Sequence, residues 1–204
     1  MLLATLLFQR STNALSLPLT RRSFVHSLVS VPIVTITTNN ANAAGDDTTF
    51  TYSPKDGSFK LSLSLPSSDQ FSLKQKPLKT HAEELTFCPS DSSERCSAKT
   101  FGVTVDPVKI KSLSEFGSPE EIVERIADAE RGRDGIFEVK VAGFAPVKGG
   151  GVDVDYISKG KRGEKFVSTR TYVLNQKLFV FTSSVKGEAG FDDMKNIRDS
   201  FVIE

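Results

Sequence analysis

Apolar and polar residues alternate near the middle of the chain, and this pattern predicts a β-strand. Phe101, Val103 and Val105 would share one face of the strand, with glycine or polar residues between them. Pro107 follows and cannot donate a backbone hydrogen bond, so we expect regular strand pairing to end there. The pattern therefore predicts a half-buried strand over residues 100–106.

A helix is predicted to begin shortly after this strand. Ser118 is a suitable N-cap, Pro119 suits the first helical turn, and Glu121 stands three residues after Ser118, as in a capping box. Gly132 and Gly135 then favour an end to the helix at about Arg131.

The predicted helix has one apolar stripe, because Ile122, Ile126 and Ala129 recur at helical spacing. Charged residues fill most of the remaining positions, and we expect them to form a solvated face: Glu120, Glu121, Glu124, Arg125, Asp128 and Glu130.

Shorter alternating runs predict further strands at 50–52, 58–65, 79–87, 136–141, 152–157, 162–174 and 178–185. Residues 66–77 are expected to form a polar loop, and 191–199 a second helix. In the predicted strand 136–141, the residues Phe137, Val139 and Val141 would share one apolar face. In the predicted strand 152–157, Val154 and Tyr156 would share one face, with Asp153 and Asp155 on the opposite face. A tight turn at Asn175 and the short spacing between strands predict an antiparallel meander.

The first 43 residues differ in composition from the rest of the chain. They contain no Asp or Glu, and their only charges are Arg10, Arg21 and Arg22. Arg21 and Arg22 precede an apolar segment as in a twin-arginine signal, and the small residues up to Ala43 suit cleavage before Ala44. We expect residues 1–43 to be a plastid-targeting and twin-arginine leader. The alternatives are a bacterial export signal and a chance arginine pair in a single transit peptide; the apolar start also suits an endomembrane signal of a secondary plastid.

The body after this leader is long enough for one domain and nearly neutral. Of 26 basic and 25 acidic residues in the 204-residue chain, only the three leader arginines are removed with residues 1–43. The remaining balance, 23 basic to 25 acidic, provides no general attraction to nucleic acid. The mixture of strands and helices predicts an α+β fold, with a central antiparallel sheet flanked by helices.

Several sequence phrases resemble the PsbP family, the lumenal extrinsic and auxiliary proteins associated with photosystem II. They are YSPKDGSF at 52–59, VTVDPV at 103–108, SLSEFGSPEEI at 112–122, YISKGKRGEKF at 156–166, LNQKLF at 174–179 and a terminal SF at 200–201. The resemblance implies a PsbP-like α-β-α sandwich over residues 44–204, with a hairpin turn at Asp56 and Gly57. Compared with the family pattern, residues 143–151 resemble an inserted loop. The chain has no Trp where the family often has it, which indicates a PsbP-like paralogue rather than the principal extrinsic subunit.

The motifs of common enzymes are missing from the sequence after residue 43. That part has a single histidine, His81, and no nucleophile elbow, so a hydrolase triad lacks its components. The glycine run at 149–151 is not followed by the Lys and Ser or Thr of a phosphate-binding loop. We expect no enzymatic activity, and a small hydrolase is a remote alternative.

His81 and Glu83 are the candidate metal ligands, because they would share one face of a strand. Some PsbP-family members bind divalent cations, so the resemblance implies a Ca²⁺, Mn²⁺ or Zn²⁺ contact at this position. A divalent-metal-handling lumenal protein is therefore the alternative function. The other interpretation is a solvated histidine beside acidic residues.

Cys88 and Cys96 bracket a short polar segment between two predicted strands. In an oxidising compartment this arrangement favours a structural disulfide, and the alternatives are a regulated dithiol or two free thiols.

Basic residues gather at one predicted hairpin and on the linker before the first helix. They are Lys159, Lys161, Arg162 and Lys165 on the hairpin, and Lys109 and Lys111 on the linker. They either maintain solubility or dock on acidic lumenal faces of a membrane complex. The resemblance implies a thylakoid-lumen protein, monomeric when free and peripheral to the membrane, that binds photosystem II. Other family members serve photosystem I assembly or the thylakoid dehydrogenase complex.

Overall fold

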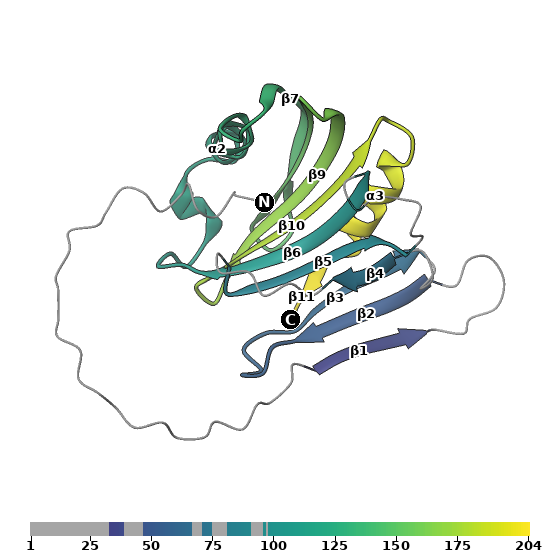
Figure 1. Cartoon of the computed structure of the whole chain (residues 1–204). Helices are drawn as coiled ribbons and strands as arrows, with labels where there is room; N and C mark the ends of the chain where they lie inside the picture. Colours follow the sequence, from purple (N-terminus) through teal and green to yellow (C-terminus); the bar gives the residue numbers. More distant parts are fainter. Residues whose placement is uncertain (1–32, 39–46, 67–70, 75–80, 91–95, 97) are drawn as a thin grey trace, which may run out of the picture.

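The computed structural model describes residues 33–38, 47–66, 71–74, 81–90, 96 and 98–204. Its strands form two antiparallel sheets, one of seven strands and one of four (Figure 1). Within the described residues, no helix is both long and apolar enough to span a membrane.

The larger sheet has the strand order β4-β5-β6-β10-β9-β8-β7. Its strands are β4 (Phe71–Lys74), β5 (Glu83–Pro89), β6 (Lys99–Pro107), β7 (Ile136–Val147), β8 (Gly151–Gly160), β9 (Gly163–Leu174) and β10 (Lys177–Lys186). The predicted meander is confirmed for β7 to β10, which pair consecutively. Asn175 and Gln176 both have positive φ, as the two-residue hairpin between β9 and β10 requires.

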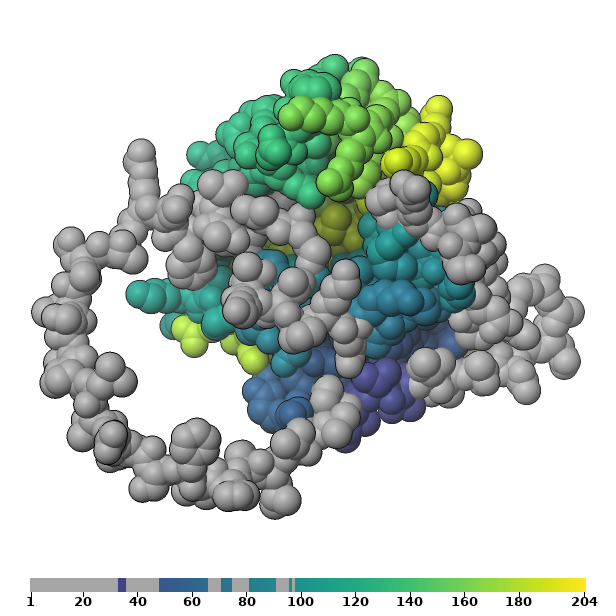
Figure 2. Space-filling view, viewed as in Figure 1, coloured from purple at the N-terminus to yellow at the C-terminus, as the bar shows by residue number. Residues whose placement is uncertain are grey.

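The smaller sheet joins the two ends of the described chain. Its strands are β1 (Ile33–Thr38), β2 (Asp47–Ser53), β3 (Leu61–Pro66) and β11 (Val202–Ile203), in that order. Gly57, in the β2–β3 connection, donates its N–H to the carbonyl of Pro54 at 3.0 Å. Figure 2 shows β1 to β3 of the smaller sheet, purple and blue, at one end of the molecule, and the green region around α2 at the other.

Two α-helices and one 3₁₀ helix complete the described part of the fold: η1 (Leu113–Phe116), α2 (Pro119–Arg131) and α3 (Phe191–Asp199). The predicted capping box of α2 is confirmed, because the Ser118 hydroxyl accepts the N–H of Glu121 while Ser118 N–H donates to the Glu121 carboxylate at 2.8 Å. Its N-cap and Pro119 at the first position explain why the helix begins there.

The larger sheet has an apolar core on each face. On one face, aromatic residues pack between the two sheets: Phe50, Phe87, Phe101, Phe179 and Phe181 are all nearly inaccessible to solvent. On the other face, Ile122 and Ile126 of α2 pack against Val154 and Tyr156 of β8. The larger sheet therefore has one packed layer on each face, and burial of apolar area stabilises both contacts.

The predicted architecture, one sheet sandwiched between helices, is only partly right. Helices do lie on both faces of the larger sheet, but the smaller sheet, and not a helical layer, covers much of the face on the α3 side (Figure 1). The fold is thus richer in β-structure than predicted.

Three local predictions are wrong, each for an identifiable reason. Phe137 is 72% exposed, because a β-bulge between Ile136 and Glu138 turns it away from the face that Val139 occupies. Residues 143–147 extend β7 and are not an inserted loop; Pro146 is tolerated there because β7 is an edge strand. Finally, the predicted polar loop contains β4, which pairs with β5.

β1 lies within the segment predicted to be a removable leader. It pairs with β2 from Ile33 to Thr38, at the edge of the smaller sheet. Ile33 is 69% exposed and Val34 37%, so these two side chains add little to the core. Arg21, Arg22 and the predicted cleavage site between Ala43 and Ala44 lie outside the described residues.

Candidate functional site

The larger sheet has an open cleft beside the C-terminal end of α2. Its volume is about 390 Å³, and it adjoins a second hollow of about 240 Å³ that extends over β10, β6 and β5. The two hollows share Glu130, Arg133, Tyr156, Lys165, Thr182 and Ser184. The first hollow is called the basic cleft below, and its charged lining residues are Glu130, Arg133, Asp134, Lys161, Arg162 and Lys165.

Two tight turns shape one wall of the basic cleft. The turn after α2 contains Gly135 with φ +82°, and Lys161 in the β8–β9 turn donates its N–H to the Gly135 carbonyl at 2.8 Å. A Cβ at residue 160 would overlap that same carbonyl oxygen. Gly160 therefore allows the two turns to pack against each other, which brings the end of α2 next to the β8–β9 hairpin.

Glu130 is buried at the base of the basic cleft, contrary to the prediction that it belongs to a solvated face. It is 4% exposed, and its carboxylate accepts hydrogen bonds from Ser158 Oγ and Arg133 Nη1, both at 2.8 Å. The sequence did contain a signal, since Glu130 follows Ile122 and Ile126 at intervals of four residues on the apolar stripe.

The positive charges of the basic cleft are only partly matched by acids. Lys161 Nζ lies 4.0 Å from Asp134, while the neighbouring Lys159 pairs with Glu164 at 3.3 Å and Glu138 at 3.7 Å. Arg162 and Lys165 form no ion pair with any residue that the structure describes. The cleft thus contains two cations that form no ion pair within the described part of the chain.

Lys165 is the less exposed of these two cations. It is partly buried, and burial lowers the pKa of its ammonium group; Arg133, Lys186 and Arg162 lower that pKa further, while Glu130 acts in the opposite direction. Both desolvation and like charge disfavour a protonated amine. Lys165 is therefore placed where an incoming anion would be stabilised.

The structure brings four of the six predicted docking residues together and leaves two apart. Lys159, Lys161, Arg162 and Lys165 surround the β8–β9 turn. Lys109 and Lys111 follow the end of β6. The last residue of β6, Pro107, pairs with Lys177, and Lys177 lies at the opposite end of β10 from Lys186. At about 3.3 Å per residue, the strands separate the two groups by roughly 30 Å.

His81 and Glu83 have different partners in the structure. The imidazole Nδ1 of His81 lies 2.7 Å from a carboxylate oxygen of Asp106, and its side chain is only 3% exposed. Glu83 accepts the Tyr52 hydroxyl at 2.6 Å. Within the described ranges, no group of three His, Cys, Asp or Glu side chains is arranged to hold a metal ion. The proposed metal contact at His81 and Glu83 remains a prediction.

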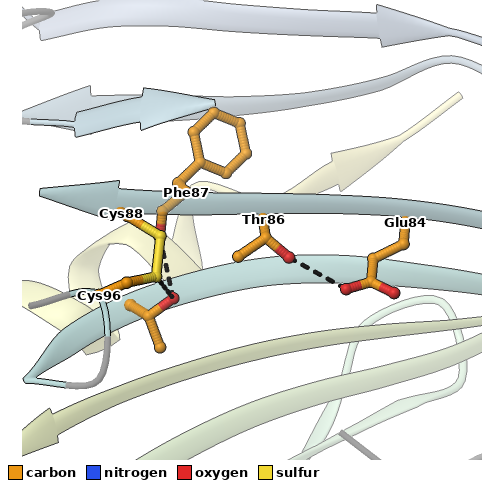
Figure 3. The surroundings of a disulfide bond; sticks show 6 residues. Glu84, Thr86, Phe87, Cys88 and Cys96 are labelled. Atoms are coloured by element: carbon orange, nitrogen blue, oxygen red, sulfur yellow. Dashed lines mark hydrogen bonds between the residues drawn. A yellow bond between two sulfur atoms is a disulfide. The ribbon is translucent and has the colours of Figure 1, made fainter. Parts of the chain in front are cut away.

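Cys88 and Cys96 are joined by a disulfide in the structure, with their Cα atoms 4.8 Å apart (Figure 3). Cys88 is buried at the end of β5, and Thr100 at the start of β6 donates its hydroxyl to the Phe87 carbonyl at 2.9 Å. The bridge thus lies at the end of the β5–β6 pair, and β5 is three strands away from β9 in the sheet order.

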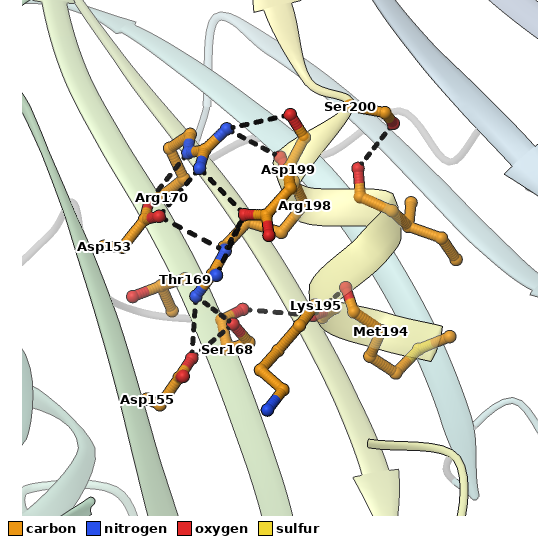
Figure 4. A network of polar contacts seen from close by, with 12 residues as sticks. Asp153, Asp155, Ser168, Thr169, Arg170, Met194, Lys195, Arg198, Asp199 and Ser200 are labelled. Carbon is orange, nitrogen blue, oxygen red and sulfur yellow. Dashed lines mark hydrogen bonds and ion pairs between the residues drawn. The ribbon is translucent and has the colours of Figure 1, made fainter. Parts of the chain in front are cut away.

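A second charged cluster lies on the opposite face of the larger sheet, between β8, β9 and α3 (Figure 4). Arg170 and Arg198 are both less than 10% exposed, and they pair with Asp153, Asp155 and Asp199. The cluster joins α3 to the sheet. Because both guanidinium groups are paired with carboxylates, neither is left unpaired to bind a ligand. Strand alternation predicted the face of the two β8 aspartates, but not their partners.

Comparisons with known proteins find similarity to PsbP proteins both in sequence and in fold. In sequence, the chain is 32% identical over 87 residues to PsbP domain-containing protein 2, chloroplastic, of Arabidopsis thaliana. This match covers 41% of the chain and 38% of the relative, so the chain spans well under half of that relative's length. No protein-family model matches the chain.

In fold, the chain is similar to cyanobacterial PsbP (CyanoP) from Synechocystis sp. PCC 6803. The TM-score is 0.58 with 14% identity, over 82% of this chain and 98% of the other. LpqN, involved in cell envelope biogenesis of Mycobacterium tuberculosis, gives a TM-score of 0.47 with 10% identity, over 83% and 91% of the two chains. The sequence and fold comparisons with the two PsbP proteins confirm the PsbP-like resemblance predicted from the motifs.

Proposed function

We propose that this protein is an auxiliary protein of the thylakoid lumen that binds photosystem II, or another photosynthetic membrane complex, and supports its assembly, repair or water oxidation. The observation that carries the proposal is the combined similarity to PsbP domain-containing protein 2 in sequence and to cyanobacterial PsbP in fold. PsbP domain-containing protein 2 is chloroplastic by name, and the predicted twin-arginine leader is consistent with onward transport to the lumen.

The proposed mode of action is contact between surfaces, without chemical turnover. The rim of the basic cleft supports this mode, because Lys161 and Arg162 are exposed on the turn between β8 and β9. Exposed cations of this kind accelerate encounter with an acidic surface and fix its orientation, and salt weakens the attraction. Acidic lumenal surfaces of a membrane complex are the partner with complementary charge.

Fractionation of intact thylakoids tests the proposed location. We expect the processed protein inside the thylakoid, protected from added protease until the membrane is opened by detergent. Crosslinking with mass spectrometry in the same membranes should then join residues near the β8–β9 turn to a lumenal subunit. A processed protein in the stroma, digested in intact thylakoid preparations, would contradict the proposal.

A further inference from the structure

Two lysines stand directly opposite each other at the edge of the basic cleft. In the register of β9 and β10, Lys165 pairs with Lys186, and on its other side Lys165 faces Ser158 of β8. Like charges at directly opposed positions of an antiparallel sheet are destabilising. Lys165 forms no ion pair within the described chain that would offset this repulsion.

The charges lining the basic cleft leave a net excess of two positive charges. Four cations, Arg133, Lys161, Arg162 and Lys165, are opposed by Glu130 and Asp134 alone. Glu130 is already bonded to Arg133 and Ser158, and the side chain of Asp134 is fully exposed at the rim. The excess matches a dianion better than the single charge of a carboxylate. A phosphate monoester carries a charge of about −1.5 to −2 near pH 7.

Hydroxyl groups lie beside the cationic end of the cleft. Thr182 and Ser184 of β10 line both hollows, and Thr100 of β6 lines the hollow that continues toward β5. These side chains give a ligand larger than a bare ion a polar floor with donors and acceptors.

We propose that the basic cleft binds a small phosphate-bearing ligand, with the phosphate held by Lys165, Arg133 and Arg162 and the polar remainder lying over Thr182 and Ser184. Lysine and arginine are the usual donors to phosphate, and a charge-assisted contact would offset the repulsion between Lys165 and Lys186. The proposal goes beyond the docking function, since it concerns a small molecule within the cleft; Arg162 would contribute to both.

An NMR titration of the ¹⁵N-labelled body tests this site. Inorganic phosphate and glycerol 2-phosphate are added separately, with sodium chloride adjusted to hold ionic strength constant. We expect saturable shifts of the backbone amides of residues 158–165 and 182–184 with both probes. The ester should bind more tightly than inorganic phosphate, because its organic part contacts Thr182 and Ser184. Lys165→Met should weaken binding at least tenfold. Arg162→Gln, which replaces an exposed side chain, should weaken binding several-fold.

Lys140→Met is the matched control, because Lys140 is an exposed cation on β7 that does not line the cleft. It should bind both probes as the wild type does. Shifts that grow linearly without saturation, or that are the same in Lys165→Met, would overturn the proposal. So would shifts of these amides caused by an acidic peptide but not by either phosphate probe, since the cleft would then be a protein-docking surface.

Discussion

Arg170 and Asp153 form a bidentate ion pair between β9 and β8, in which Nε and Nη2 of the guanidinium each lie 2.7 Å from a different carboxylate oxygen. Nη1 of Arg170 also donates to the carbonyl of Arg198 at 3.0 Å, at the end of α3 (Figure 4). One buried side chain therefore joins two strands and the C-terminal helix.

Removing Arg170 is expected to destabilise the body strongly. Arg170→Met leaves Asp153 and two helix-end carbonyls without their main donor in a buried position, and breaking a buried pair in this way costs about 3–5 kcal/mol. Urea unfolding measures the change, with Asp134→Asn, which alters an exposed pair, as a control that leaves the midpoint unchanged. A loss below about 1 kcal/mol would show that the pair is not a structural link.

Alkaline pH is expected to destabilise the protein through Tyr52. Burial raises the pKa of its hydroxyl above the ordinary value near 10, and the hydrogen bond to Glu83 adds to the effect. A raised folded-state pKa means that stability is fully present below pH 10 and is lost as pH rises beyond it, because only the unfolded tyrosine ionises there.

Tyr52→Phe should therefore make the fall of unfolding free energy above pH 10 shallower, while reducing stability at pH 7 by about 1 kcal/mol through the lost hydrogen bond. The difference between the two proteins isolates Tyr52, since Tyr156 and Lys165 titrate in both. Parallel curves for wild type and variant above pH 10 would refute the assignment.

Reducing the Cys88–Cys96 bridge is expected to lower stability without unfolding the body. The bridge closes a short loop, with a sequence separation of 8, and chain entropy gives roughly 2.5 kcal/mol for a loop of this size. Urea unfolding with and without a phosphine reductant measures the loss. The Cys88→Ser, Cys96→Ser double variant serves as control, because its stability should not respond to the reductant. Equal stability of the oxidised and reduced wild type would argue against a structural bridge.

A chain that begins at Ala44 is expected to keep the fold. Its loss of β1 removes an edge strand whose Ile33 and Val34 are mostly exposed, and leaves the aromatic core between the sheets intact. We expect the same NMR dispersion for the short and the full chain, with unfolding free energies within about 1 kcal/mol. Loss of cooperative unfolding in the short chain would mean that residues 33–38 are part of the folded domain and not of a removable leader.

The sequence was most informative where local chemistry decides the structure. The cap at Ser118, the two-residue turn at Asn175 and the alternation of Phe101 with its neighbours depend on short-range rules, and the structure agrees with each. β4 was missed because its four residues are too few to show a period. The bulge beside Phe137 was missed because the amino-acid composition does not indicate a bulge. One extra residue nevertheless reverses the face of the sheet on which neighbouring side chains lie.

The candidate site was predicted less completely than the fold. The β8–β9 lysines were visible as a charge run, but Arg133 and Glu130 join them only because two turns pack together through Gly160. The wide separation of Lys109 from Lys161 likewise depends on strand direction, which pairs Pro107 with Lys177 at the far end of the sheet. Tertiary contacts of this kind have no local sequence signal.

Cosedimentation with inside-out thylakoid vesicles, measured at about 20 and 200 mM sodium chloride, tests the central claim most directly. The body should bind the exposed lumenal face at low salt and be released at high salt, where the screening length is shorter. Lys161→Gln, Arg162→Gln should abolish most low-salt binding, while Lys109→Gln, Lys111→Gln, which removes the same charge at the other end of the sheet, should retain it. Binding that is equal in both double variants, or insensitive to salt, would contradict docking through the exposed rim of the basic cleft.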